Sequence, residues 1–212
     1  MKQFKVYNAN DISNLPKTSW IVDGEIQDEG FAVIYGAPGT YKSFIALDLA
    51  LHVAQTGNVV YVAAEGASGG WEDRKNAWCV MHKKGADNLF FVFDAIKMLD
   101  VDQGGDVHAF IEAIAPYQPR LVVIDTMARC MVGGSDSSDR DVGAFVYAVD
   151  EIRQCLGTAV LVVHHAGKNG EYRGSSALLG AADTFLAVKR VGKNRVHLKP
   201  EKVKDGSEDG MR

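Results

Sequence analysis

The chain has 212 residues, of which 47% are apolar and 24% are charged, and its formal net charge is −4. This composition supports a hydrophobic core and argues against a disordered chain. The acidic balance argues against a surface coated with charge for nucleic-acid binding, although a few basic loops could still hold a strand. Three cysteines without C-x-x-C spacing argue against a disulfide or metal framework and favour core thiols in a reducing compartment.

The first 29 residues are polar and irregular, and Trp20-Ile21-Val22 is their apolar anchor. They lack the apolar core of a secretion signal, and no apolar run along the chain reaches the roughly 18 residues of a membrane helix. We therefore expect a cytoplasmic protein with no membrane partner. Residues 1–29 are expected to form an arm or linker, and residues 30–212 a single domain.

Six short apolar runs follow, rich in β-branched and aromatic residues, as in strands covered on both faces. They are residues 31–35, 58–64, 89–93, 121–126, 159–163 and 184–189. Helical patterns alternate with them, and residues 107–114 and 142–156 show apolar stripes at helical spacing. Gly57 and Gly157 follow two of the helices, where we expect left-handed caps. The alternation predicts an α/β fold with a largely parallel, twisted sheet and helices on both faces.

The first predicted strand is followed by Gly-Ala-Pro-Gly-Thr-Tyr-Lys-Ser and then by a predicted helix. This is the context of a phosphate-binding loop, whose usual pattern is G-x-x-x-x-G-K-[ST]; an ordinary Gly/Pro turn is the alternative. Lys42 is expected to reach the β- and γ-phosphates of ATP, and the Ser43 hydroxyl to bind Mg²⁺. The expected nucleotide-binding residues are Gly36, Ala37, Pro38, Gly39, Thr40, Tyr41, Lys42, Ser43 and Phe44.

Tyr41 occupies the place of the second glycine of this pattern. Glycine tolerates a positive φ and leaves room beside the phosphates, whereas tyrosine should avoid a positive φ and must point its ring out of the loop. We therefore expect a negative φ at Tyr41, with the ring packed against the fold or facing a neighbouring protomer.

Polar side chains follow three later strands, at the edge of a parallel sheet where ligands bind. Asp125 is expected to be a magnesium ligand opposite Ser43, and Glu65 to orient or deprotonate the attacking water. The alternatives without a function are a solvated loop glutamate for Glu65 and an ordinary strand-capping aspartate for Asp125. His164 and His165 must point to opposite faces, because side chains alternate along a strand; one is expected to contact the γ-phosphate, and a metal site is the alternative.

The segments GAPGTYKS, VAAEG, VVIDT, VVHHAGK and RGSSALLGAAD occur in this order. They resemble the motifs of the RecA-like P-loop NTPase core of the RepA and DnaB-type hexameric replicative helicases, and are most similar to phage and plasmid RepA-like ATPases. The resemblance covers about residues 18–204. It implies that residues 30–212 form a RecA-like ATPase domain.

The resemblance also implies residue roles. Glu65 corresponds to the catalytic base and His165 to the γ-phosphate sensor. A basic finger that reaches the nucleotide of a neighbouring subunit is matched by Arg190, or by the pair Lys202 and Lys204, where lysine replaces the arginine of the family. A solvated basic tail is the alternative for this pair.

In such rings, two central loops contact DNA. The loop after the Asp125 strand contains Arg129 and is acidic beyond it, and Asp139 is expected near the N-terminus of the next helix. The loop after His165 contains Lys168, Tyr172 and Arg173, a basic and aromatic set suited to phosphate contact and base stacking.

These features predict a Mg²⁺-dependent ATP hydrolase that forms a ring, expected to be a hexamer, and moves on single-stranded DNA in phage or plasmid replication. One alternative is a RecA-like regulatory or recombination ATPase without unwinding activity. The other is a nucleotide-binding interaction module that does not hydrolyse its ligand.

Overall fold

The computed structural model describes residues 6–14, 17–67, 70–99, 105–167, 172, 174–192 and 195–206. Its elements, in chain order, are η1 (Ala9–Asn14), β1 (Trp20–Val22), β2 (Ile26–Gln27), β3 (Phe31–Gly36), α1 (Lys42–Val53), β4 (Val59–Ala63), α2 (Gly70–His82), β5 (Leu89–Val92), α3 (Asp106–Ile114), η3 (Ala115–Tyr117), β6 (Leu121–Asp125), α4 (Met127–Cys130), α5 (Asp139–Leu156), β7 (Ala159–His165), α6 (Ser176–Ala181), β8 (Thr184–Arg190) and β9 (Val196–Val203). No helix in the described part of the chain is long and apolar enough to cross a membrane.

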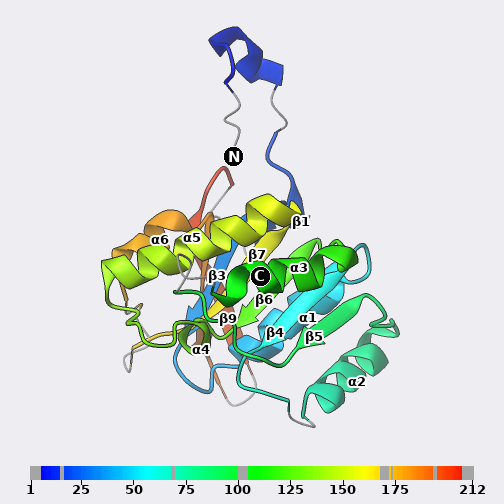
Figure 1. Ribbon diagram of the computed structural model, residues 1–212. Helices are drawn as coiled ribbons and strands as arrows, with labels where there is room; N and C mark the ends of the chain where they lie inside the picture. Colours follow the sequence, from blue (N-terminus) through cyan, green and yellow to red (C-terminus); the bar gives the residue numbers. More distant parts are fainter. Residues whose placement is uncertain are drawn as a thin grey trace.

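Seven strands form one sheet in the order β5-β4-β6-β7-β3-β8-β9 (Figure 1). Every neighbouring pair is parallel except β8 and β9, which are antiparallel. Parallel strands need crossover connections, which the helices between them provide. The expected α/β class is confirmed, and each of the six predicted apolar runs contains a strand of this sheet.

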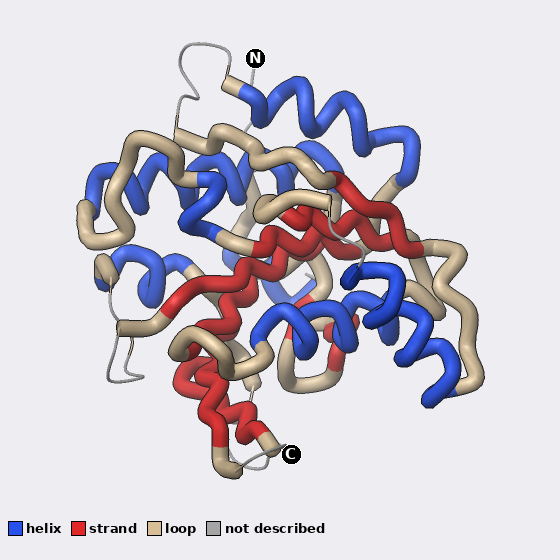
Figure 2. Tube along the Cα trace, turned by 90° about the horizontal axis from the view of Figure 1, so that it is seen from below, coloured by secondary structure: helices blue, strands red, loops and turns tan. Residues whose placement is uncertain are grey.

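Alternate residues of the central strands are buried on opposite faces of the sheet, and helices cover both faces (Figure 2). On β6, Val122 and Ile124 pack in the core formed with α3 and α5, whereas Leu121 and Val123 pack in the core formed with α1. Burial on both faces explains why these strands are continuous apolar runs in the sequence. It also fixes the face on which each polar side chain at a strand end emerges.

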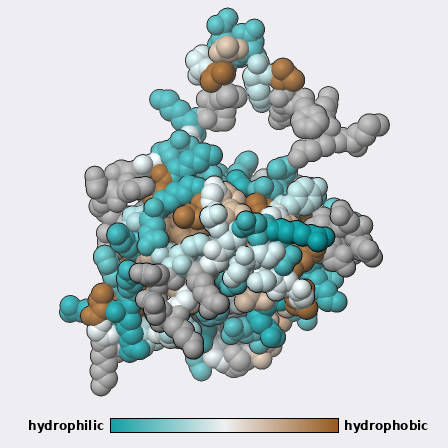
Figure 3. All heavy atoms as spheres, turned by 90° about the vertical axis from the view of Figure 1, so that its left-hand side faces the viewer, coloured by the Kyte–Doolittle hydropathy of each residue, from teal (hydrophilic) through white to brown (hydrophobic). Residues whose placement is uncertain are grey.

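The sequence predicts an irregular segment before β3, but part of this segment forms regular structure. β1 and β2 form an antiparallel hairpin in which Trp20 pairs with Gln27. Ile26 is fully buried in the core that contains α1, and the Gln27 side chain donates a hydrogen bond to the carbonyl of Lys204. By contrast, η1 has no buried residue and lies apart from the sheet, and apolar side chains are visible on it (Figures 1 and 3).

The antiparallel strand β9 extends the sheet beyond the six predicted runs. Its residues alternate between partly buried and exposed positions, so one of its faces meets solvent. Pro200 within the strand is compatible with a strand at the edge of the sheet, where an N–H donor can be dispensed with. This polar alternation is a weaker signal than the apolar runs of the central strands.

Of the two left-handed glycine caps that the sequence predicts, the structure contains one. Gly157 follows α5 with φ +60°, so the left-handed cap is confirmed. The prediction for Gly57 is wrong, because α1 ends at Val53 with the right-handed Ala54 as its cap, and Gly57 has no positive φ. A Cβ atom at Gly57 would lie 3.2 Å from side-chain atoms of Arg120. Close approach of this side chain gives the physical reason for a glycine here.

Candidate nucleotide-binding site

The loop between β3 and α1 has the backbone of a phosphate-binding loop. Gly36 ends β3 where a Cβ atom would lie 2.5 Å from the carbonyl oxygen of Val188, so no larger residue fits without a shift of β8. Gly39 has φ +76°, a conformation that favours glycine. The Thr40 hydroxyl donates to the Ala37 carbonyl at 2.8 Å and closes the turn before α1. The positive end of the α1 dipole therefore points toward this loop.

Lys42 lies folded over the loop. Its side chain is buried, and its Nζ donates hydrogen bonds to the carbonyls of Gly36 at 2.9 Å and Ala37 at 3.0 Å. Burial lowers the pKa of Lys42, while Asp125 and Glu65 oppose the shift. Because the ammonium group is already largely removed from water, it loses little further hydration when phosphate oxygens bind to the loop.

The prediction of a negative φ at Tyr41 is wrong. Tyr41 has φ 65° and ψ 25°, and it is the N-cap residue of α1. Its carbonyl accepts the first helical hydrogen bonds, from Phe44 N at 3.0 Å and Ile45 N at 3.1 Å. The loop therefore needs a left-handed residue at this position, which is the conformation that glycine adopts in the usual pattern.

The Tyr41 ring points out of the loop, as we had expected. Its centroid lies 5.8 Å from that of Phe44 in an edge-to-face arrangement, and the Arg190 guanidinium carbon lies 5.2 Å from it. Tyr41 is 39% exposed. The ring therefore does not block the space above Gly36 and Lys42.

Asp125 lies beside Ser43 at the end of β6. It is 4% exposed, and its Oδ2 accepts a hydrogen bond of 2.8 Å from the Tyr61 hydroxyl. Burial raises the pKa of Asp125, whereas hydrogen bonds from Ser43 and Tyr61 oppose the shift. Glu65 raises this pKa further, and His165 lowers it.

The oxygen atoms of Ser43 and Asp125 fit Mg²⁺. This ion prefers oxygen ligands and keeps several waters and substrate phosphates in its coordination shell, so two protein ligands suffice. Within the described residues, no group of three or more His, Cys, Asp or Glu side chains could hold a metal ion by itself. The donor set therefore suits an ion shared with a bound nucleotide.

Glu65 lines a pocket together with Ser43 and Asp125. A pocket of about 210 Å³ is lined by Ser43, Glu65, Gly66, Trp71, Arg74 and Asp125. Glu65 is exposed, and Gly66 turns the chain after it with φ +102°. A carboxylate at this position can accept a proton from a water molecule held in the pocket.

Arg74 is a pocket residue that the sequence did not indicate. It lies on α2, and its guanidinium carbon is 4.4 Å from the Phe44 ring centroid and 4.9 Å from that of Trp71. These contacts hold a positive charge at the pocket that contains Glu65. No motif marks Arg74, because its position depends on how α2 packs against α1.

The two histidines at the end of β7 point to opposite faces, as predicted. His165 pairs with Gly36 across the sheet, and burial and nearby Lys42 lower its pKa, opposed by Glu65 and Asp125. Its Nδ1 is buried and has no hydrogen-bond partner among the described residues. His164 is buried on the other face, where its ring centroid lies 5.9 Å from that of Tyr172. His165 is therefore the histidine on the side of the phosphate loop.

Comparison with known proteins agrees with this geometry. The family model of the AAA domain matches residues 3–171. The chain belongs to the AAA domain family. With this match, the RecA-like P-loop NTPase fold that we had expected is confirmed, and the domain is of an ATPase type, which implies nucleotide binding.

The AAA domain is also similar to the DNA repair protein RadA of Mycobacterium tuberculosis. The two curated proteins, from strains CDC 1551 / Oshkosh and ATCC 25618 / H37Rv, are each 26% identical to it over 170 residues. The match covers 78% of this chain and 33% of each relative. The chain thus spans about a third of the length of the curated relatives that it matches.

Among the predicted finger residues, Arg190 lies apart from Lys202 and Lys204, which both contact residues at or just after the end of α6. Arg190 lies over Tyr41 of its own chain, as described above. Lys202 Nζ donates to the carbonyls of Leu179 and Gly180 at the end of α6, at 2.9 Å each. Lys204 forms an ion pair of 3.5 Å with Asp183. Within one chain, only Arg190 of these three lies beside the phosphate loop, and a role for any of them in a neighbouring site stays a prediction.

The residues expected to contact DNA are only partly described. Arg129 lies on α4, and its Nε donates to the Ala64 carbonyl at 3.4 Å, near the end of β4. The Tyr172 ring packs against Tyr35 and Phe185, and its hydroxyl donates to the Ser175 carbonyl at 2.6 Å. Tyr172 is thus engaged in packing, which does not match an open stacking platform. Lys168 and Arg173 lie outside the described residues.

The acidic loop has a structural role that we had expected in part. Asp139 is the first residue of α5, where its charge favours the helix N-terminus. Its side chain also accepts a hydrogen bond from Ser175, and Ser175 N donates to the Asp136 carbonyl at 2.8 Å. These contacts join the segment after β6 to the segment after β7.

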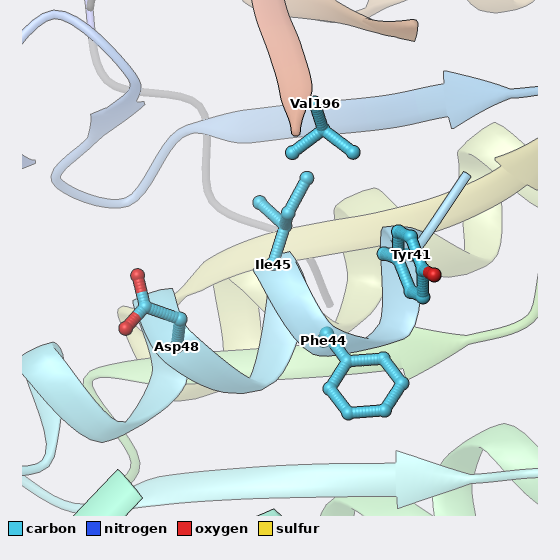
Figure 4. A pocket seen from close by; sticks show the side chains of 5 residues that line it. All are labelled: Tyr41, Phe44, Ile45, Asp48 and Val196. Atoms are coloured by element: carbon cyan, nitrogen blue, oxygen red, sulfur yellow. The ribbon is translucent and has the colours of Figure 1, made fainter. Parts of the chain in front are cut away.

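A second and wider pocket lies on the other side of the start of α1 (Figure 4). Its volume is about 450 Å³, and it is lined by Tyr41, Phe44, Ile45, Asp48 and Val196. In Figure 4 the side chains of Ile45 and Val196 point toward one another between α1 and β9. The pocket is mostly apolar, begins beside the phosphate loop and is large enough for an aromatic group.

Proposed function

We propose that this AAA domain is a Mg²⁺-dependent ATP hydrolase that works as a multimer on single-stranded DNA. The observation that carries the proposal is the convergence of Lys42, Ser43, Asp125, Glu65 and His165, from four different strand ends, around the loop between β3 and α1. An ordinary turn would not need a buried lysine, two carboxylates and a histidine beside it.

The residues divide the work as follows. The loop N–H groups and Lys42 bind the triphosphate, and Ser43 and Asp125 hold Mg²⁺, which when bound would neutralise phosphate charge. Glu65 orients a water molecule and accepts its proton. The wide pocket beside Tyr41 is a suitable place for the nucleoside, on the side of α1 away from Glu65.

His165 would contact the γ-phosphate. Because burial lowers its pKa, the imidazole is neutral at physiological pH, with one ring N–H as a donor and one nitrogen as an acceptor. A neutral sensor can change its hydrogen bonds when the γ-phosphate leaves, without a change of its own charge.

Assembly would complete the site. The charge that develops on the transferring phosphoryl group is stabilised by cations, and in several P-loop enzymes one of them comes from another chain. Arg190, Lys202 or Lys204 of a neighbouring copy are the candidates. The resemblance to the RepA and DnaB-type helicases supports a ring, and we propose that this ring moves along single-stranded DNA.

The second candidate function is a DNA repair or recombination ATPase without unwinding activity. The likeness to the DNA repair protein RadA favours it, as do the acids at positions 136, 139 and 141, which would repel a DNA backbone. Both candidates share the ATPase site. They differ in what ATP hydrolysis drives.

Two assays at low salt separate the candidates. ATP hydrolysis is measured with and without a short single strand, and strand displacement is measured on a forked duplex. The motor predicts that single-stranded DNA stimulates hydrolysis and that displacement requires ATP. Stimulation without displacement supports the repair or recombination ATPase, and absence of stimulation contradicts the motor.

A further inference from the structure

Tyr61 is a buried tyrosine at the edge of the site that no motif marks. It lies on β4, where it is fully buried in the core that contains α1. Two residues further along the strand, Ala63 lies directly beside Asp125 in the pairing of β4 with β6. The small alanine leaves room for the Tyr61 side chain to reach forward to the carboxylate.

The Tyr61 hydroxyl lies between the carboxylate of Asp125, an expected magnesium ligand, and the backbone of Ser43. It is 2.8 Å from Oδ2 of Asp125 and 3.4 Å from the carbonyl oxygen of Ser43. The hydroxyl has one proton, so the shorter contact defines the bond. A phenol hydroxyl carries its proton at neutral pH, so Tyr61 is the donor and the Asp125 carboxylate is the acceptor in this bond.

Neighbouring rings hold Tyr61 in this position. Its ring centroid lies 5.0 Å from that of Trp71 and 5.6 Å from that of Phe91. Trp71 also lines the pocket that contains Glu65 and Asp125. The direction of the phenol oxygen is therefore set by packing before any ligand binds.

We propose that Tyr61 is a positioning residue that orients the Asp125 carboxylate for Mg²⁺ through its hydrogen bond to Oδ2. This hydrogen bond fixes the direction of the Asp125 carboxylate before any ion is bound. Groups that hydrogen-bond to metal ligands orient them, and their loss commonly costs 10–100-fold in metal affinity or activity. The inference rests on the proposed function, because it assigns a residue to the same site.

The test compares ATP binding with and without magnesium in Tyr61→Phe. This variant removes the hydroxyl and keeps the ring contacts with Trp71 and Phe91. ATP affinity is measured calorimetrically in excess Mg²⁺ and again in EDTA, and the ratio gives the affinity gained from Mg²⁺. We expect Tyr61→Phe to reduce this gain about tenfold or more and to leave the affinity in EDTA unchanged.

Two controls isolate the mechanism. Tyr35→Phe removes a hydroxyl from a buried tyrosine on the opposite face of the sheet, in the core with α5, and should leave the gain from Mg²⁺ unchanged. In an Asp125→Asn background, Tyr61→Phe should cause no further change, because Tyr61 acts through that carboxylate. Thermal unfolding of each variant without ligand shows whether the fold is intact.

The outcomes separate this inference from the function on which it rests. An unchanged gain from Mg²⁺ in Tyr61→Phe overturns the inference, and so does an equal loss of ATP affinity with and without the ion. A wild-type chain that binds no ATP overturns the proposed function instead. An effect of Tyr61→Phe that is undiminished in the Asp125→Asn background also contradicts the inference.

Discussion

Tyr41 has a left-handed backbone in a position where the phosphate-loop pattern has glycine. A residue with a side chain loses about 1–2 kcal/mol in this conformation relative to glycine. The ring contacts with Phe44 and Arg190 offset part of this cost, because edge-to-face and cation–π contacts contribute about 0.5–1 kcal/mol each. The loop geometry therefore determines φ, and the side chain adapts by pointing outward.

Substitution of Tyr41 tests this account. Tyr41→Ala keeps the cost of the left-handed backbone and loses the ring, whereas Tyr41→Gly loses the ring and removes the cost. We expect Tyr41→Gly to be about 1 kcal/mol more stable than Tyr41→Ala in urea unfolding. Equal stability of the two variants would contradict a positive φ at this position.

The lowered pKa of His165 predicts that the free energy of unfolding depends on pH. Its pKa in the folded chain lies below the value of 6.5 that applies when it is unfolded. Between these two values the unfolded chain binds more protons, so His165 makes the folded state less stable as the pH falls through 6.5. We expect the nucleotide-free wild type to lose stability relative to His165→Asn as the pH falls from about 7.5 to about 5.5. Urea unfolding at several pH values measures this difference, and a gain in relative stability on acidification would contradict it.

Gly36 shows how two strands shape the phosphate loop. A Cβ atom there would lie 2.5 Å from the Val188 carbonyl of β8 and 2.9 Å from Thr40 Oγ1. Gly36→Ala should destabilise the fold by about 1–3 kcal/mol and weaken ATP binding, because β8 or the loop must shift.

Gly143→Ala is the matched control for that substitution. Gly143 is exposed in the interior of α5, and a Cβ atom there would meet no other atom within 4 Å. Alanine favours the helix by about 1 kcal/mol, so this variant should be more stable and should bind ATP normally. Equal effects of the two substitutions on stability in urea would contradict the close packing of the loop against β8.

The elements that the sequence predicted well are those with two buried faces. β3, β4, β6 and β7 are apolar on both sides, so each appears as a continuous run. β9 and the β1–β2 hairpin have a solvent-facing side or only two or three residues, and their patterns are too short or too polar to stand out. Their positions depend on long-range pairing, such as the contact of Gln27 with Lys204.

In the candidate site too, residues marked by local sequence patterns could be predicted, whereas residues placed by long-range packing could not. Lys42 could be predicted from the phosphate-loop pattern, and Asp125 and Glu65 could be predicted because the carboxyl ends of parallel strands meet at one edge of the sheet. Arg74 and Tyr61 could not, since their roles arise from the packing of α2 and from a diagonal contact between β4 and β6. The φ of Tyr41 was predicted wrongly because residue preference was weighed without the loop geometry that overrides it.

The whole molecule is proposed to work as a ring. If a neighbouring copy completes the ATPase site, ATP, Mg²⁺ and single-stranded DNA should favour assembly by mass action. Light scattering in their presence should show a particle with the mass of several chains, expected to be six, and a smaller particle without them. A monomer under both conditions would contradict the ring and leave hydrolysis to a single chain.

The central claim is that the residues around the phosphate loop hydrolyse ATP, and Glu65→Gln tests it most directly. ATP binding and turnover are measured on the same preparations of wild type and variant, with Lys42→Ala as a variant expected to lose binding. We predict that Glu65→Gln binds ATP as the wild type does and that its turnover falls about 10²–10⁴-fold, the usual contribution of a general base. Turnover at the wild-type rate in Glu65→Gln, or a wild type that binds ATP and does not hydrolyse it under any condition tested, would contradict the account.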